Sequence, residues 1–191
     1  TSIRTHFTRR KFMKYLYIAE KPSSMQAAKS AYEAAGCPLG QIDFIGLAGH
    51  VCGLMEPKEY PQWQKKWRDL TLPMVPDDFL VKPIKKDIVK KIRDMLKNGN
   101  YDAIIVGTDS DVEGNGIYAL LEKYLHLEDI KTFRFFEKDL TSKEIMRSFA
   151  NLTDFHTNPR DIGMTQAYWI RAMFDWLIGF NLSVAYTVKT N

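Results

Sequence analysis

Residues 103–121 are AIIVGTDSDVEGNGIYALL, and their order predicts three successive elements. The apolar start is typical of a strand that is buried on both faces of a parallel sheet. Three acids then follow at alternate positions, Asp109, Asp111 and Glu113, before Gly114 and a second apolar run. The segment therefore predicts a strand, an acid-rich turn and a helix.

The three carboxylates have two explanations. In an extended chain Asp109 and Asp111 point to the same side, and Glu113 joins them where the turn enters the helix. Such acids repel one another unless a cation lies among them. Three hard oxygen ligands suit Mg²⁺, which keeps several waters and takes few protein carboxylates. Alternatively, Asp109 and Ser110 form only a turn and cap the following helix.

Other motifs that use acids or glycines do not fit the spacing. A calcium loop that begins at Asp109 needs a glutamate at its twelfth position, which here is Leu120. The glycines of GNGIYA imitate a dinucleotide-binding turn, but the acids before them would repel a pyrophosphate. The chain has neither a GKS nor a GKT sequence, and its two cysteines, Cys37 and Cys52, do not form a CxxC pair. A phosphate loop, a zinc site and a disulfide framework are therefore not indicated.

The remaining sequence alternates between strand and helix patterns. Strands are predicted at 14–19, 42–47, 102–107 and 131–136. Helices are predicted between Pro22 and Gly36, at 84–96 and 114–125, and from Thr141 or Ser142 onward. In the first helix the serines after Pro22 are the candidate start residues. This order predicts an α/β fold, with a mostly parallel sheet of about four strands flanked by helices. Its ligand site is expected at the carboxyl ends of the strands.

Glu20 and Lys21 stand directly after the first predicted strand. If that strand is parallel to and adjacent to the 102–107 strand, Glu20 converges on the three acids. A glutamate beside a metal ion and a phosphate is suited to general acid or base catalysis, and a lysine can neutralise a phosphate oxygen. Without that context, Glu20 and Lys21 would be an ordinary surface ion pair.

Composition points to a globular protein of the cytoplasm. The chain has 191 residues and a net charge of +4, and it lacks both a membrane-length apolar run and a secretory signal. Residues 1–12 contain four basic residues and no acid, so the rest of the chain is neutral. We interpret 1–12 as a basic leader or upstream sequence, or alternatively as an arm that contacts DNA. Residues 82–97 are also basic, which is typical of a solvated helix face or of a surface beside phosphates.

Two further segments fall outside the strand–helix alternation. Residues 51–83 are rich in proline and contain Trp63 and Trp67, which predicts a packed but irregular excursion. Beyond Pro159 a long helix is predicted over about 159–179. Its Ala167, Arg171, Asp175 and Gly179 stand at steps of four, and therefore lie on one helical face. This tail is expected to begin another lobe.

These motifs together resemble a known family. A strand that ends in glutamate and a later strand that ends in DxDxEG are typical of the Toprim domain, which topoisomerases, certain primases and certain nucleases share. The motifs YIAEKPS (17–23), GHV (49–51), EPKEY (56–60) and KKWRDLTLPMVPDDF (65–79) further resemble the N-terminal part of bacterial type IA DNA topoisomerases, in particular topoisomerase III. The resemblance implies a Toprim domain over 13–150, with the excursion 51–83 inside it. Residues 151–191 would begin the following helical domain.

The resemblance also implies roles for individual residues. It assigns Asp109, Asp111 and Glu113 to an Mg²⁺ site, Glu20 to acid/base catalysis, Lys21 to the region of the scissile phosphate, and Arg171 and Asp175 to the path of single-stranded DNA. Two positions depart from the family pattern. Val112 stands where arginine is usual, and Asn115 where glutamate or glutamine is frequent. His50 matches a family position, but it is as well explained as a structural residue as by a phosphate contact.

The nucleophile that the family uses is not found in this chain. Type IA topoisomerases are ATP-independent isomerases that cut one strand with a tyrosine from a later domain, and none of the nine tyrosines here has a matching context. We therefore interpret the chain as an N-terminal fragment, inactive alone, whose parent relaxes or decatenates DNA. Its partners would be single-stranded or negatively supercoiled DNA and the remaining domains of the parent, without a membrane. The alternatives are a self-contained, metal-dependent Toprim nuclease and a non-catalytic DNA-binding module.

Overall fold

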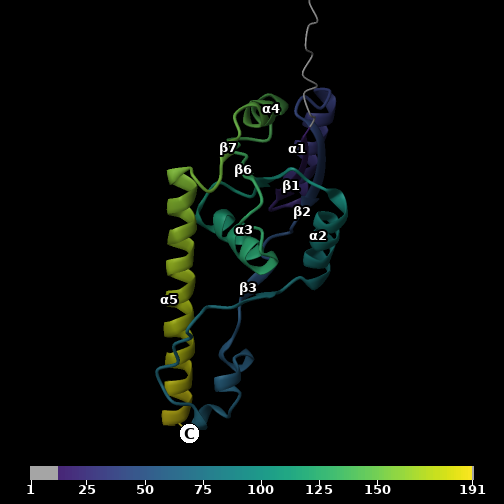
Figure 1. Ribbon diagram of the computed structural model, residues 1–191. Helices are drawn as coiled ribbons and strands as arrows, with labels where there is room; N and C mark the ends of the chain where they lie inside the picture. Colours follow the sequence, from purple (N-terminus) through teal and green to yellow (C-terminus); the bar gives the residue numbers. More distant parts are fainter. Residues whose placement is uncertain (1–12, 191) are drawn as a thin grey trace, which may run out of the picture.

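The computed structural model describes residues 13–190, with side chains for residues 13–188 (Figure 1). The basic segment 1–12 lies outside the described residues. The strands are β1 Met13–Ala19, β2 Gly40–Gly46, β3 Cys52–Leu54, β4 Val81–Pro83, β5 Ala103–Gly107, β6 Thr132–Arg134 and β7 Thr153–Asp154. The helices are α1 Pro22–Ala34, α2 Lys86–Gly99, α3 Val112–Leu125, α4 Ser142–Ala150 and α5 Pro159–Thr190, with short 3-10 helices at Pro57–Glu59, Pro61–Trp63 and Trp67–Asp69. In this part of the chain, no helix is long and apolar enough to cross a membrane.

The central sheet has the strand order β2-β1-β5-β6-β7. The first four strands run parallel, and only the short β7 is antiparallel to its neighbour β6. β1 pairs with β2 on one side and with β5 on the other, so the strand order changes direction between β1 and β5. In open α/β sheets, ligands bind outside the carboxyl ends of the strands at such a point.

Helices cover both faces of this sheet, as the sequence predicts. Leu16 and Ile18 of β1 point to the face that α2 and α3 cover, where Ile92 and Leu121 are fully buried. Tyr17 and its neighbours at alternate positions point to the other face, which α1 and α4 cover. Because both faces are buried, β1 from Tyr15 onward and β5 are apolar throughout rather than alternating, whereas the edge strand β2 also contains the polar Gln41 and Asp43.

The excursion between β2 and α2 packs against α5. β3 and β4 form a separate antiparallel pair, and the 3-10 helices lie between them along the chain. Trp176 of α5 is buried against the excursion and donates a hydrogen bond from its indole N–H to the Met55 carbonyl at 2.7 Å. In Figure 1, α5 runs beside α3 in its upper half and beside the excursion in its lower half. The excursion therefore consists of two short strands and short 3-10 helices joined by loops, and its apolar side chains pack against α5.

Two predicted boundaries are wrong, each for a local reason. α1 begins at Pro22 itself rather than at the serines after it, and Lys21 precedes it in extended conformation without a side-chain cap. Proline suits the first helical position because its missing N–H has no partner to lose there. α5 continues past Gly179 to Thr190. Asn181 explains this extension, since its side chain exchanges hydrogen bonds with the backbone of Met74 in the excursion.

Candidate functional site

Glu20, Lys21 and Asp109 meet at the carboxyl ends of β1 and β5. The pairing of Ala19 with Gly107 brings the ends of the two strands level. The backbone N–H of Asp109 points at the Glu20 carboxylate with an N···O distance of 3.4 Å. The convergence of Glu20 on the acid-rich turn, which the sequence predicts only if these strands are adjacent, is therefore confirmed.

Lys21 lies between the two carboxylates. Its ammonium contacts Asp109 at 2.8 Å and Glu20 at 3.8 Å. The hydrogen bond to Asp109, aided by the negative charges of Asp109 and Glu20, raises the pKa of Lys21, so this lysine stays positively charged. The Lys21 side chain is about half exposed, which leaves its ammonium within reach of a ligand from solvent.

Asp111 and Glu113 have different local roles in the same turn. Asp111 is the N-cap of α3 and accepts a hydrogen bond from the Gly114 N–H at 2.7 Å. Glu113, in the first helical turn, is paired with the His50 ring at 2.6 Å and with the guanidinium of Arg171. Burial raises the pKa of Glu113, but the hydrogen bonds from Arg171 and His50 outweigh it, and the net pKa is lowered.

Gly114 allows the turn to fold this tightly. A Cβ atom at this position would lie 2.0 Å from the carbonyl oxygen of Asp109. No other residue can follow Glu113 here without moving the backbone that carries Asp109. The glycine of the DxDxEG pattern is thus required by a close approach of two backbone segments.

The geometry of the acids suits a magnesium ion bound by one or two protein carboxylates better than an ion bound by all three. Within residues 13–188, no three acidic, histidine or cysteine side chains lie close enough together to surround an ion. Asp109 is matched by Lys21, and Glu113 by His50 and Arg171. However, Asp109 and Asp111 both reach solvent, and Mg²⁺ commonly uses one or two carboxylates together with waters and phosphate oxygens. Their hard oxygen donors therefore fit Mg²⁺, whereas the three-ligand set stays a prediction.

The two residues predicted to lie on a DNA path are placed differently. Arg171 reaches from α5 to Glu113 and also lies over the ring of Tyr168, 5.6 Å from its centre. Asp175 is exposed one turn further along α5 and adds to the negative potential around Arg171. Arg171 thus joins the acid-rich turn, whereas Asp175 lies beside it.

Glu137 is a member of this site that the sequence analysis missed. It follows β6, the strand next to β5, and lines with Asp109 and Lys21 a cavity of about 390 Å³. Burial, and then the charges of Asp109 and Asp139, raise the pKa of Glu137 to about 7. Its Oε2 is buried without a hydrogen-bond partner among the described residues. The topological signal was available, because Glu137 lies beyond the carboxyl end of a neighbouring parallel strand.

A buried polar network behind the turn explains Asn115. Arg134, at the end of β6, pairs with Asp161 of α5 at 2.9 Å and donates to the Thr108 carbonyl at 3.0 Å. The Asn115 side chain accepts a hydrogen bond from Arg134 and donates to Asp161 at 3.2 Å. The network therefore ties the start of the turn and α3 to the first turn of α5. The other departure, Val112, packs against the apolar core between the sheet and α3.

Comparison with known proteins agrees with this geometry. The family model of the Toprim domain matches residues 15–138. The chain belongs to the Toprim domain family. The expected Toprim fold is confirmed by this match and by the parallel sheet between two helical layers.

Curated relatives of this Toprim chain are named topoisomerases. It is 29% identical to DNA topoisomerase 3 of Vibrio cholerae over 189 residues. This alignment covers 92% of this chain and 28% of the Vibrio cholerae protein. It is 27% identical over 190 residues to DNA topoisomerase 1 of Alkalihalophilus pseudofirmus, covering 91% of this chain and 26% of that protein. For DNA topoisomerase 3 of Haemophilus influenzae the identity is 28% over 185 residues, covering 91% and 28%. The chain thus spans about a quarter of the length of these relatives, and its resemblance to topoisomerase III is confirmed.

Proposed function

We propose that this chain is the N-terminal, Toprim-containing part of a type IA DNA topoisomerase, an ATP-independent isomerase that cuts and reseals one DNA strand to relax or decatenate DNA. The carrying observation is that Glu20, Lys21 and Asp109 meet at the ends of two adjacent parallel strands. Relatives named DNA topoisomerase 3 and DNA topoisomerase 1 support the proposal. Residues 13–150 would be the Toprim domain, and residues 151–191 the start of the next one.

The roles of the residues follow from their positions. Glu20 would give a proton to the sugar oxygen that leaves when a tyrosine oxygen bonds to the phosphorus, and would take it back on resealing. Lys21 would hold a non-bridging oxygen of the same phosphate. Asp109 and Asp111, with Glu113 beside them, would hold Mg²⁺, which when bound neutralises charge on the phosphate oxygens. The tyrosine would come from another domain of the parent.

DNA and the remaining domains of the parent are the proposed partners. Arg171 and Asp175 lie on the face of α5 beside the acid-rich turn and would flank a single strand. A second observation supports further domains. Large apolar side chains at steps of four are exposed along α5: Ile170, Phe174, Ile178, Leu182 and Tyr186. An apolar stripe of this length is typical of a surface that another domain covers.

The proposal is tested by cleavage and metal binding together. The chain and its Asp109→Ala variant are incubated with labelled single-stranded DNA and RNA in Mg²⁺ or Mn²⁺, and titrated with each metal by calorimetry. We expect metal binding that the variant loses, and no cleavage of either nucleic acid. Cleavage that Asp109→Ala abolishes would show a self-contained nuclease instead, and absent metal binding would refute the assigned site.

A further inference from the structure

A second cavity lies directly behind the acid-rich turn. It has a volume of about 400 Å³ and is bounded by the segment after β6, by α4 and by the start of α5. Ser110, which stands between Asp109 and Asp111, forms part of its wall. Sites for small molecules commonly have volumes of about 300 to 1,000 Å³, and the volume of this cavity lies within that range. The cavity is therefore large enough for a ligand and shares a loop with the proposed magnesium site.

The walls of this cavity carry more positive than negative charge. Its cations are Arg134, Lys138, Arg147 and Arg160, and its acids are Glu144 and Asp161. The acids are already used, since Asp161 pairs with Arg134 at 2.9 Å and Glu144 with Arg147 at 3.5 Å. Lys138 and Arg160 have no acidic partner among the described residues. Two positive charges are thus left to attract an anion.

Arg160 is held in place by the turn and by an aromatic ring. Its guanidinium donates a hydrogen bond to the Ser110 carbonyl at 3.2 Å. The same group lies over the ring of Phe136, 4.4 Å from its centre. A planar guanidinium fixed in this way holds its other N–H donors side by side, in a geometry that allows bidentate hydrogen bonds to phosphate oxygens. Side-chain amides on the cavity wall, from Asn151 and Asn158, add further polar groups.

Arg160 and Arg171 lie on the same face of α5 and hold two sides of the acid-rich turn. They are eleven residues apart, which is close to three full helical turns and about 16 Å along the axis. Arg160 contacts Ser110, whereas Arg171 contacts Glu113. A single strand of DNA that follows this face of α5 would therefore pass one arginine before the acid-rich turn and another after it.

We propose that the cavity beside Arg160 and Lys138 is a binding subsite for a nucleotide phosphate of a single DNA strand, next to the strand segment at the acid-rich turn. This inference rests on the proposed function, because it takes the strand to lie along α5. The recognised group is a phosphate ester, which a free mononucleotide also carries. Its contacts position the strand and carry no direct sequence information.

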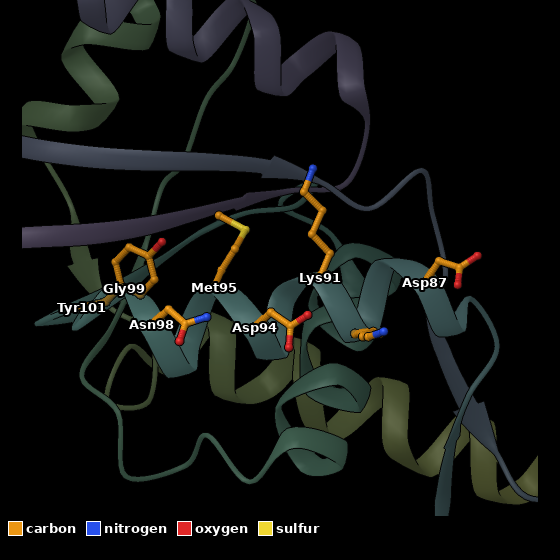
Figure 2. Close-up of a pocket in the computed structure, with 8 residues that line it drawn as sticks. Asp87, Lys91, Asp94, Met95, Asn98, Gly99 and Tyr101 are labelled. Carbon is orange, nitrogen blue, oxygen red and sulfur yellow. The ribbon is translucent and has the colours of Figure 1, made fainter.

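The hollow along α2 supplies a matched control. It is larger, about 570 Å³, and Lys90 and Lys91 stand on its wall. Asp87 and Asp94 stand beside them, so the charges balance (Figure 2). α2 also covers the opposite face of the sheet from α4. Removing two lysine charges here changes the net charge as much as removing those of Arg160 and Lys138.

The experiment compares three proteins for binding of a fluorescently labelled 12-nucleotide single strand, by anisotropy in EDTA at several salt concentrations. They are the unmodified chain, the Arg160→Gln/Lys138→Gln variant and the Lys90→Gln/Lys91→Gln variant. We expect the cavity variant to bind about 10-fold more weakly or worse at low salt, with a salt dependence reduced by about one to two phosphate contacts. The α2 variant should change affinity by less than about 2-fold. Circular dichroism and thermal unfolding show whether each variant is folded.

The outcomes separate this inference from the proposed function. Equal losses in the two variants, or no loss in the cavity variant, would overturn the subsite. Calorimetry with deoxythymidine monophosphate tests the other source. Mononucleotide binding that the cavity variant loses, while its affinity for the single strand is unchanged, would make the site one for free nucleotides instead of a strand. Mg²⁺ titration of Asp109→Ala tests the acid-rich turn independently. A cavity variant that binds the strand normally, beside an Asp109→Ala variant that loses Mg²⁺, would refute only the subsite.

Discussion

Replacing Glu137 by glutamine is expected to stabilise the protein, and to do so only at neutral and alkaline pH. The Glu137 carboxyl is partly buried near Asp109 and Asp139, and one of its oxygens has no hydrogen-bond partner in the described part of the chain. Ionising this group in the folded protein is therefore unfavourable. Glutamine keeps nearly the same shape and stays neutral at every pH.

The size of the effect follows from the pKa of Glu137. Burial, with the nearby acids, raises it to about 7 in the folded protein, from an ordinary value of 4.5. Between these two values the folded state holds a proton that the unfolded state has released. The free energy of unfolding of the unmodified chain is therefore not reduced by Glu137 below pH 4.5, and it falls as the pH rises from 4.5 toward 7. Each pKa unit corresponds to about 1.4 kcal/mol, which gives an upper bound of about 3.5 kcal/mol. Because the side chain is partly solvated, we expect about 2 kcal/mol at pH 8.

Urea unfolding in EDTA, followed by tryptophan fluorescence, measures this difference at pH 4.5, 6 and 8. We expect Glu137→Gln to match the unmodified chain at pH 4.5 and to exceed its unfolding free energy at pH 8. Glu128→Gln is the control, because Glu128 is exposed, and its substitution should change stability by less than about 0.5 kcal/mol at any pH.

A pH-independent difference, or none, would refute the argument and would mean that solvent or the Tyr17 hydroxyl already stabilises the Glu137 carboxylate. A second arm repeats the pH 8 measurement in saturating Mg²⁺. If the ion binds at Asp109 as proposed, its charge favours ionised Glu137 and the gain should shrink.

Three further substitutions test other parts of the structure. Asp161→Asn leaves the Arg134 guanidinium, which is 2% exposed, without its counter-charge. It should lower the unfolding free energy, measured in urea, by about 3–5 kcal/mol, and unchanged stability would contradict the role of the ion pair. Gly114→Ala forces a Cβ against the Asp109 carbonyl, so it should lower the unfolding free energy by about 1–3 kcal/mol and weaken Mg²⁺ binding in calorimetry. Normal Mg²⁺ affinity would count against the turn geometry. Trp176→Ala should cost about 3–5 kcal/mol and speed proteolysis of the excursion without changing Mg²⁺ affinity; an unchanged cleavage rate would exclude the tryptophan as its anchor.

The elements of the sheet, and the positions of Glu20 and Asp109 at the ends of two strands, could be predicted because they depend on short-range patterns. Two apolar runs of strand length separated by helices imply parallel strands, and the carboxyl ends of parallel strands lie at one edge. The adjacency of β1 and β5 had to be assumed, since strand order depends on long-range packing. The structure supplies it through the register of Ala19 with Gly107.

The partners of the acids could not be predicted in the same way. Glu113 is paired with His50 and Arg171, which come from segments 63 residues before it and 58 residues after it. The burial of Glu137 beside Asp109 arises only in the folded chain, and no local pattern marks it. Asn115 could be noticed in the sequence only as a departure from the family pattern, because its partners Arg134 and Asp161 meet it only in the folded chain.

The cations around the acid-rich turn explain how it can fold with so much negative charge. Lys21 neutralises Asp109, and Arg171 neutralises Glu113. Both cations are on exposed side chains, and ion pairs at the surface are worth only about 0 to 1 kcal/mol, so they can be exchanged at little cost. A bound magnesium ion would replace Lys21 and Arg171 as the positive partner of the acids. A DNA phosphate would then be the negative partner of the released lysine and arginine. We therefore expect metal and DNA to bind cooperatively, which Mg²⁺ titrations with and without a single-stranded oligonucleotide would measure. Equal Mg²⁺ affinities in the two titrations would show that the lysine and arginine remain on the acids when the strand is bound.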